Sequence, residues 1–181
     1  MNNTKKMRKV LAFLLAIVLA VSTLSISASA KSFSDVSSSH YALDGINYVS
    51  DNGFMSGTSS TSFSPNTAIT RAMLVTVLYQ KTGSPAVSGN NPFTDVSASA
   101  YYAKAVIWAS SNGITSGTSS TTFSPNQNVT RQDAITFLYR FATKMGSDTS
   151  KTASITGYSD YSSVSSYART AMSWALGSNI V

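Results

Sequence analysis

The feature of this chain that most constrains its fold is an internal repeat with a period of sixty residues. The polar segment GTSSTSFSPNTAITRA at residues 57–72 returns as GTSSTTFSPNQNVTRQ at residues 117–132, and FSDV at residue 33 returns as FTDV at residue 93. Both matches share this offset without gaps. A fixed period of this length indicates one structural unit used repeatedly, and such units bury a core by stacking on one another.

A third copy of the unit begins near the end of the sequence but stops halfway. Tyr167 and Trp174 match Tyr101 and Trp108 at an offset of 66, yet no GTSST loop and no Thr-Arg pair follow before Val181. The incomplete copy suggests a fragment or a truncated product. We therefore expect a signal peptide at residues 1–30, a first copy with its linker at 31–92, a second copy with its linker at 93–157 and a partial third copy at 158–181.

The first thirty residues have the pattern of a secretory signal peptide. Several lysines and an arginine precede an apolar run at residues 10–21, and Ala28-Ser29-Ala30 supplies the small residues of a cleavage site. The run is shorter than the roughly twenty residues that a membrane-spanning helix needs. We therefore expect a secreted protein that has no membrane contact after cleavage.

The net charge limits the binding partners that can be expected, and the cysteine content limits the cellular compartment. Beyond residue 30 the chain holds nine Lys and Arg against seven Asp, so its net charge is only +2 and gives no argument for binding nucleic acid. The chain has no cysteine, so disulfide staples are excluded. This composition fits export from a bacterium better than a small eukaryotic secreted domain.

Each copy reads as a helix, a loop and a second helix, which predicts an all-α fold. Thr70 and Thr130 are suitable N-caps for the second helices. The first helices are expected from apolar side chains at helical spacing, over residues 39–52, 99–112 and 165–178.

Further signals mark where these helices begin and end. Asp133 can close a capping box with its N-cap threonine, and Ser99 can cap the first helix of the second copy. Gly53 and Gly113 fit the left-handed position that follows a helix. Neither helix pair could bury its apolar stripe alone, so we expect the copies to pack against each other.

Residues that could support catalysis or hold a metal are sparse. His40 is the only histidine and has no counterpart in the other copies, and the seven Asp do not cluster at ligand spacing. No nucleophile-elbow motif occurs, and only the paired carboxylates of a glycosidase stay formally open. We therefore expect no enzyme activity, no cofactor and no metal site in this chain.

The repeated arginines are more informative. Arg71 and Arg131 each follow an N-cap threonine directly, where a cation costs about half a kcal/mol because the helix start is positive. One explanation is an anion held jointly by the guanidinium and the helix start. The alternative is a structural arginine that pairs with a carboxylate such as Asp35 or Asp95.

A tyrosine stands near the start of the first helix in every copy, at Tyr41, Tyr101 and Tyr167. Exposed tyrosines beside an arginine could stack on sugar faces while their hydroxyls bond to sugar oxygens. The alternative is that these rings pack in the core or between copies.

Taken in this order, the elements resemble the S-layer homology (SLH) domain family. The resemblance rests on FxDV, an aromatic residue that opens a helix, an NGI-x-x-GT loop, FSP and ITRA, and it covers two full copies and half of a third. It implies an all-helical assembly about a pseudo-threefold axis that anchors exported proteins non-covalently to secondary cell-wall polysaccharide. That glycan often carries acidic ketal-pyruvate groups. Each copy would then build one wall of a sugar-binding groove at the bacterial cell surface.

The resemblance also assigns candidate ligand-binding residues. The arginine of the family's TRAE motif falls on Arg71 and Arg131, and the motif's Glu is replaced by Met73 in the first copy and Asp133 in the second. The family's frequent Trp at the first helix is a Tyr in all three copies. The other matching positions are the FxD aspartates and the loop glycines, namely Asp35, Asp95, Asp160, Gly57 and Gly117.

Two other functions remain open on the sequence. The chain could be a structural or protein-interaction repeat that forms an oligomer through its incomplete third copy, whose apolar helix face lacks a partner. It could also be the anchoring part of a longer cell-wall hydrolase. A continuation into a complete GT…FSP…TR copy would favour the binding module, and a domain rich in His, Glu or Cys would favour the enzyme.

We predict that the exported protein begins at Lys31, because signal peptidase cuts after small residues such as those at 28–30. Mass spectrometry of protein secreted by a bacterial host should show this mature N-terminus. Secreted protein that retains Met1 would contradict the signal-peptide assignment.

Overall fold

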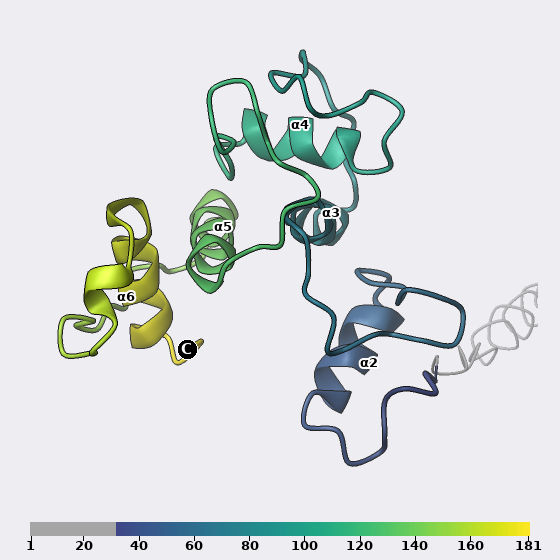
Figure 1. Ribbon diagram of the computed structural model, residues 1–181, viewed down its shortest axis with the longest axis horizontal. Helices are drawn as coiled ribbons and strands as arrows, with labels where there is room; N and C mark the ends of the chain where they lie inside the picture. Colours follow the sequence, from purple (N-terminus) through teal and green to yellow (C-terminus); the bar gives the residue numbers. More distant parts are fainter. Residues whose placement is uncertain (1–31) are drawn as a thin grey trace, which may run out of the picture. The chain divides into compact units, whose positions relative to one another are not determined.

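The computed structural model describes residues 32–181, and this part of the chain is helical (Figure 1). The signal peptide expected at residues 1–30 lies outside the described residues. Within 32–181 there is no strand, only an isolated bridge between Thr70 and Asn128, so the all-α prediction is confirmed. The helices are α2 (Leu43–Asp51), α3 (Arg71–Lys81), α4 (Ala103–Ser111), α5 (Arg131–Lys144) and α6 (Arg169–Gly177), with 3₁₀ turns η1 (Tyr161–Ser163) and η2 (Ser166–Ala168).

The first helix of each copy begins four residues later than predicted. In the second copy, turns precede α4: the Ala100 N–H donates to the Ser97 carbonyl at 3.0 Å, and the Ala103 N–H donates to the Ala100 carbonyl at 2.9 Å. Tyr102 stands at the N-cap position and makes no side-chain cap, so the prediction of Ser99 as the N-cap is wrong. The Ser99 hydroxyl instead bonds to the Ser97 hydroxyl at 2.9 Å.

The second helices begin where the sequence predicted. The Thr70 and Thr130 hydroxyls each accept the backbone N–H three residues further on, at 3.2 Å. At the start of α5 the Thr130 hydroxyl also donates to the Asp133 carboxylate at 2.8 Å. Asp133 therefore contacts the N-cap residue through its side-chain hydroxyl. The predicted left-handed glycines are confirmed as well, since φ is 70° at Gly53 and 71° at Gly113.

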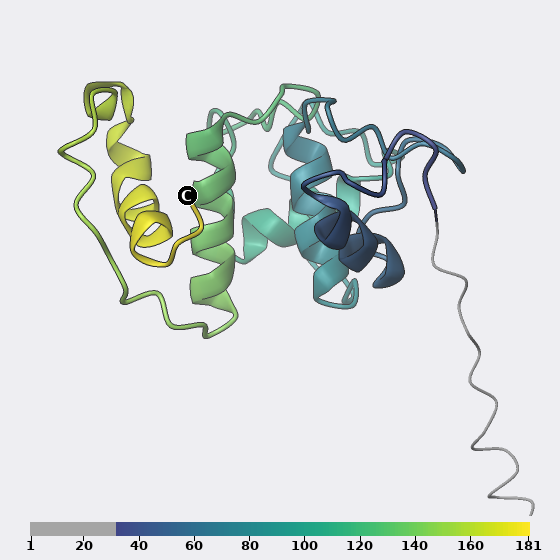
Figure 2. The same cartoon turned by 90° about the horizontal axis from the view of Figure 1, so that it is seen from below.

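The closest helix contacts join different copies (Figures 1 and 2). α4 lies against α3, α6 lies against α5, and α3 also contacts α5. Contacts within one copy are fewer, although the rings of Trp108 in α4 and Phe141 in α5 meet with centroids 6.3 Å apart. Each of the two main helix contacts contains a pair of aromatic rings. The centroids are 5.5 Å apart for Tyr79 and Trp108 between α3 and α4, and 5.5 Å apart for Tyr139 and Trp174 between α5 and α6. The predicted packing between copies is therefore present, while the pseudo-threefold arrangement stays a prediction.

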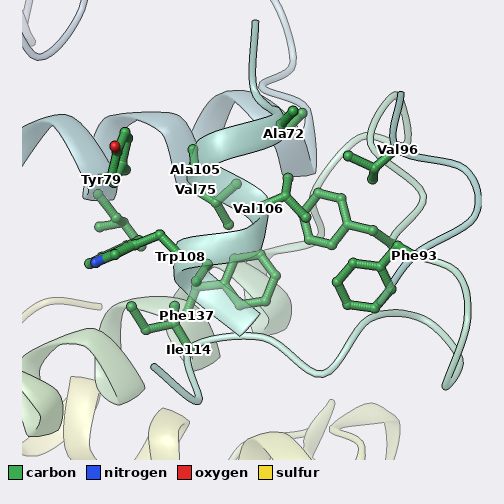
Figure 3. Packing of buried hydrophobic residues seen from close by; sticks show 14 residues of the cluster. Ala72, Val75, Tyr79, Phe93, Val96, Ala105, Val106, Trp108, Ile114 and Phe137 are labelled. Atoms are coloured by element: carbon green, nitrogen blue, oxygen red, sulfur yellow. The ribbon is translucent and has the colours of Figure 1, made fainter. Parts of the chain in front are cut away.

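The main hydrophobic core lies where the first and second copies meet (Figure 3). It combines Val75 and Tyr79 of α3 with Val106 of α4, Phe93 of the FTDV segment and Phe123 of the second loop. Complete burial of such side chains stabilises the fold by about 1.5–3 kcal/mol each. A smaller cluster joins α5 to α6 through Ile135, Ala171, Trp174 and Ala175.

The first copy contributes less to this core. α2 carries one buried residue, Ile46, and contacts no other helix in the described part of the chain. Tyr48 of α2 is 55% exposed, whereas Trp108 at the matching position of α4 is 7% exposed. The difference arises because α3 covers this face of α4, and α2 has no such neighbour among residues 32–181.

We expect Phe123→Ala to lower the free energy of unfolding by about 3–5 kcal/mol, the usual cost of truncating a core Phe. The matched control is Phe63→Ala at the same position of the first copy, where the ring is only partly buried, and its cost should be smaller. Chemical denaturation of residues 31–181 measures both losses. Equal losses would argue against a core centred between the first and second copies.

Candidate functional site

Each GTSST loop is held by the aspartate of its own FxDV segment. The two carboxylate oxygens of Asp95 accept the N–H groups of Phe123 at 2.9 Å and Ser124 at 2.7 Å. Asp35 makes the matching two bonds in the first copy, also at 2.9 and 2.7 Å. Both carboxylates are therefore engaged in shaping the loops, which gives these two candidate ligand-binding residues a structural role.

These bonds keep the two aspartates ionised. The Phe63 N–H is the largest cause that lowers the pKa of Asp35 below its usual value. Burial pushes the pKa of Asp95 upward, but the backbone donors and Arg71 outweigh it, so this pKa is also lowered. Because a lowered pKa means that ionisation favours the folded state, this stabilisation is present above about pH 4 and is lost as the pH falls further.

The two loop glycines allow a turn that other residues could not make. Gly57 and Gly117 have φ of +80° and +84°, in the left-handed region. A Cβ atom on Gly117 would lie 2.5 Å from the Ser119 carbonyl oxygen and closer still to that of Thr122. Since backbone atoms cannot move aside as a side chain can, the turn requires glycine.

Arg71 is buried between the first and second copies. Its side chain is almost fully covered, and its Nε donates to the Phe123 carbonyl at 2.9 Å. The guanidinium carbon lies 5.0 Å from the Phe123 ring centroid and 5.1 Å from that of Phe137. Its carboxylate partner is Asp133, at 3.9 Å from Nη1, in place of the FxD aspartates considered from the sequence. Burial lowers the pKa of Arg71, and the Asp133 charge opposes this shift.

The backbone at the start of α3 also binds the second copy. The Arg71 N–H donates to the Gln127 carbonyl at 2.9 Å, and the Ala72 N–H donates to the Pro125 carbonyl at 3.1 Å. The first-turn donors that could have held an anion are therefore occupied at this helix. The Thr-Arg pair of the first copy serves to tie the two copies together.

A groove with a volume of about 420 Å³ opens beside Arg71, and we name it the Arg140 groove. It is assembled from three copies. The first copy supplies Arg71 and the third supplies Tyr167. The second copy supplies loop residues 115–118 and Gln127, together with one face of α5 formed by Asp133, Thr136, Phe137 and Arg140.

A second groove, of about 250 Å³, occupies the matching place one repeat earlier, and we name it the Tyr101 groove. Its loop wall consists of residues 54–58 and Phe63 of the first copy, and Tyr101 comes from the second copy. The α3 side chains that line it are Met73, Thr76, Val77 and Gln80, which stand sixty residues before the α5 set. The repeat therefore produces two grooves of the same construction.

The three repeated tyrosines differ in their surroundings. Tyr101 and Tyr167 are 71% and 51% exposed and line the two grooves. The Tyr167 hydroxyl donates to Asp133 at 2.6 Å, and burial together with this bond raises the pKa of Tyr167. Tyr41 is 92% exposed, stacks on His40 with centroids 4.8 Å apart, and lines neither groove. Packing in the core is therefore wrong for all three rings, whereas a contact between copies is present for Tyr167 through its bond to Asp133.

Arg131 and Asp160 lie apart from both grooves. They share the wall of a cavity of about 110 Å³ with apolar side chains of the third copy, among them Met172 and Leu176. Arg131 is exposed, unlike Arg71. The structure therefore separates two arginines that hold the same position in the repeat.

Sequence reasoning missed Arg140 and the role of Asp133 in the groove. A signal was available, because residues at spacings of three and four share one helix face. Asp133, Thr136, Phe137 and Arg140 follow such a spacing after the Thr-Arg pair. The partners of Arg71 could not be found in this way because they belong to the next copy.

Helix pairs that stack between copies and enclose grooves with their loops define an all-helical tandem-repeat module. Residues 32–72 and 92–135 each match the family model described as "S-layer homology domain". The chain belongs to this family through its first two copies, as the sequence resemblance predicted.

Three relatives share this part of the molecule. The chain is 31% identical over 93% of its length to an endoglucanase of Bacillus sp. (strain KSM-635). It is 34% identical over 55% of its length to the surface-layer 125 kDa protein of Lysinibacillus sphaericus. It is 28% identical over 80% of its length to an S-layer protein of Bacillus thuringiensis subsp. finitimus.

The chain spans only a small part of each relative: 19% of the endoglucanase, 8% of the surface-layer protein and 18% of the S-layer protein. The similarity to the endoglucanase is thus to a minor part of a much longer protein, and the family's domain is a non-catalytic anchor. The family and the S-layer relatives point to the cell wall or cell surface.

None of the helices within 32–181 combines the length and the apolar composition needed to cross a bilayer. In the same residues no three His, Cys, Asp or Glu side chains gather at a distance suited to a metal ion.

We expect Gly117→Ala to destabilise the fold by more than about 2 kcal/mol, because it adds a backbone clash to the strain of a positive φ. The matched control is Gly113→Ala, where φ is also positive but a Cβ meets nothing within 4 Å, and only the strain of about 1–2 kcal/mol applies. Thermal denaturation distinguishes the two variants. Similar losses at both positions would contradict the close approach at Gly117.

Proposed function

We propose that this chain anchors an exported protein to the bacterial cell wall by binding secondary cell-wall polysaccharide non-covalently. The binding sites are the Arg140 groove and the Tyr101 groove. The observation that carries the proposal is that both grooves are built from the same repeat positions, and that a Gly-Ser-Thr loop of one copy and a tyrosine of the next line each of them.

The composition of the grooves suits a sugar. Tyr101 and Tyr167 present exposed rings, on which a sugar face can stack, and hydroxyls that can bond to sugar oxygens. Loop residues 115–118 add hydroxyl and backbone groups to the lining of the Arg140 groove. The volume of about 420 Å³ lies within the usual range of roughly 300–1,000 Å³ for small-ligand sites.

In this proposal the other residues assigned by the resemblance shape the grooves or lie outside them. Gly57 and Gly117 let the loop backbone form the groove wall, and Asp35 and Asp95 hold that loop in place. Arg71 lines the Arg140 groove and contributes positive charge to it. Arg131 and Asp160 lie outside both grooves, so we assign them no contact with the glycan bound there.

The tyrosines test this proposal better than Arg71, because removing a buried arginine would disturb the fold as well as the groove. We expect Tyr101→Ala and Tyr167→Ala each to weaken binding to purified cell walls by about three- to tenfold, since an aromatic contact contributes roughly 0.5–1.5 kcal/mol. Tyr41→Ala is the matched control, since this ring lines neither groove.

The assay is co-sedimentation of residues 31–181 with walls before and after chemical removal of the polysaccharide, with melting temperatures recorded for every variant. Wild type should bind intact walls and lose binding to stripped walls. Unchanged binding to stripped walls would refute the polysaccharide as partner. Equal losses for all three tyrosine variants would refute the grooves as the binding sites.

A further inference from the structure

The second copy holds Phe123 and Ser124 of its FSP sequence with three residues. Asp95 accepts the N–H groups of Phe123 and Ser124 at 2.9 and 2.7 Å. Arg71 donates to the Phe123 carbonyl at 2.9 Å, and its guanidinium lies 5.0 Å from the centroid of the ring. The Phe93 ring meets the Phe123 ring with centroids 5.6 Å apart. These contacts form a receptor for an aromatic residue and the serine that follows it, and Phe123 is fully buried there.

The third copy has residues at the three corresponding positions. Arg131 stands sixty residues after Arg71, and Tyr158 and Asp160 belong to a YSD sequence that corresponds to FTD at residues 93–95. All three line the cavity of about 110 Å³ described above, which we name the Arg131 cavity. Within residues 32–181 no third FSP sequence occurs to fill it.

The apolar side chains at this place are exposed, whereas their counterparts in the second copy are covered. Tyr158 is 56% exposed and Phe93 is 3% exposed. Ile180, which precedes a residue of the cavity wall, is 46% exposed, and Ile114 at the matching position is fully buried. The third copy therefore leaves apolar surface uncovered where the second copy packs its FSP sequence.

The two charged groups of the Arg131 cavity are also without partners in the described part of the chain. Within residues 32–181 the structure records no side-chain hydrogen bond and no ion pair for Arg131 or Asp160. Their counterparts, Arg71 and Asp95, both bind the backbone of the second loop. The donors of Arg131 and the acceptors of Asp160 are therefore available to the backbone of a bound segment.

We propose that the Arg131 cavity is a docking site for a segment of another polypeptide in which an aromatic residue is followed by Ser-Pro. Asp160 accepts the N–H groups of the aromatic residue and the serine, and Arg131 donates to the carbonyl of the aromatic residue. The aromatic ring packs against Tyr158 and Met172. Because the cavity shares no lining residue with the two grooves, this docking is separate from glycan binding.

A second copy of this chain is a poor donor of such a segment, because both of its FSP sequences are already held. Asp35 accepts the N–H groups of Phe63 and Ser64 at 2.9 and 2.7 Å, and Asp95 makes the matching bonds in the second copy. Release of either sequence would break these bonds and unfold its loop. A different polypeptide with an unpaired segment can bind without this cost.

The test uses residues 31–181 and a fluorescently labelled synthetic peptide, GTSSTTFSPNQN, with the sequence of residues 117–128. Fluorescence anisotropy should show saturable binding, and NMR signals of residues 158–161 should shift. A peptide with alanine in place of phenylalanine should bind at least about tenfold more weakly, because burial of the ring is lost. Absence of binding at about 1 mM peptide, or equal binding of the two peptides, would refute the proposal.

Substitutions in the protein locate the site. Asp160→Asn and Arg131→Gln should each weaken binding of the peptide by about tenfold, because a hydrogen bond to a charged group is lost at an exposed position. The matched controls are Asp148→Asn and Lys144→Gln, which remove the same charges at residues outside the cavity wall. Both controls should keep the affinity of wild type.

Each remaining outcome decides for or against the proposal. If Asp160→Asn and Arg131→Gln, folded by their melting temperatures, bind the peptide as wild type does, the cavity is not the docking site. If neither variant folds, the comparison of the two peptides decides. Light scattering that shows a dimer in wild type and a monomer in Asp160→Asn would identify a second copy as the occupant and overturn the proposal. Release of the protein from cell walls by the peptide would contradict a docking site separate from the grooves.

Discussion

The structure depends most on the way Arg71 joins the first copy to the second. Burying a guanidinium costs several kcal/mol unless it is paired. Here the rings of Phe123 and Phe137, the Phe123 carbonyl and the Asp133 carboxylate surround it and offset that cost. Phe123 belongs to the core and Asp133 lines the groove. The buried guanidinium of Arg71 contacts both residues and therefore holds the core and the groove in register.

The residues that brace the loops are the same in both copies, whereas part of the helix face that lines each groove differs. The braced loop keeps the same aspartate and the same glycine in both copies, since the turn cannot form otherwise. By contrast, Met73 becomes Asp133 and Gln80 becomes Arg140 on the helix face that lines the grooves. The polar loop is therefore repeated closely because its conformation requires these residues. The side chains of the neighbouring helix face can differ between the copies.

Local signals in the sequence were sufficient to predict much of the fold. Thr70 and Thr130 cap their helices, and Gly113 ends one, because caps depend on neighbouring residues alone. The late start of α4 was missed because turns held by backbone bonds near Ser97 carry no strong sequence mark. The contacts of Arg71 could not be predicted from the sequence for another reason. Its partners lie more than fifty residues away in the next copy, and no periodicity encodes such a contact.

Because the Arg140 groove is assembled from three copies, the binding of a ligand in it is coupled to the packing of the module. At Asp133 the Arg71 guanidinium of the first copy approaches from one side, and the Tyr167 hydroxyl of the third copy donates from the other. A ligand that binds only this assembled arrangement stabilises it, by about 2.7 kcal/mol when its concentration is a hundred times Kd. Under the proposed function, the module is therefore most stable while it is bound to the wall, because separating the copies would also require release of the bound glycan.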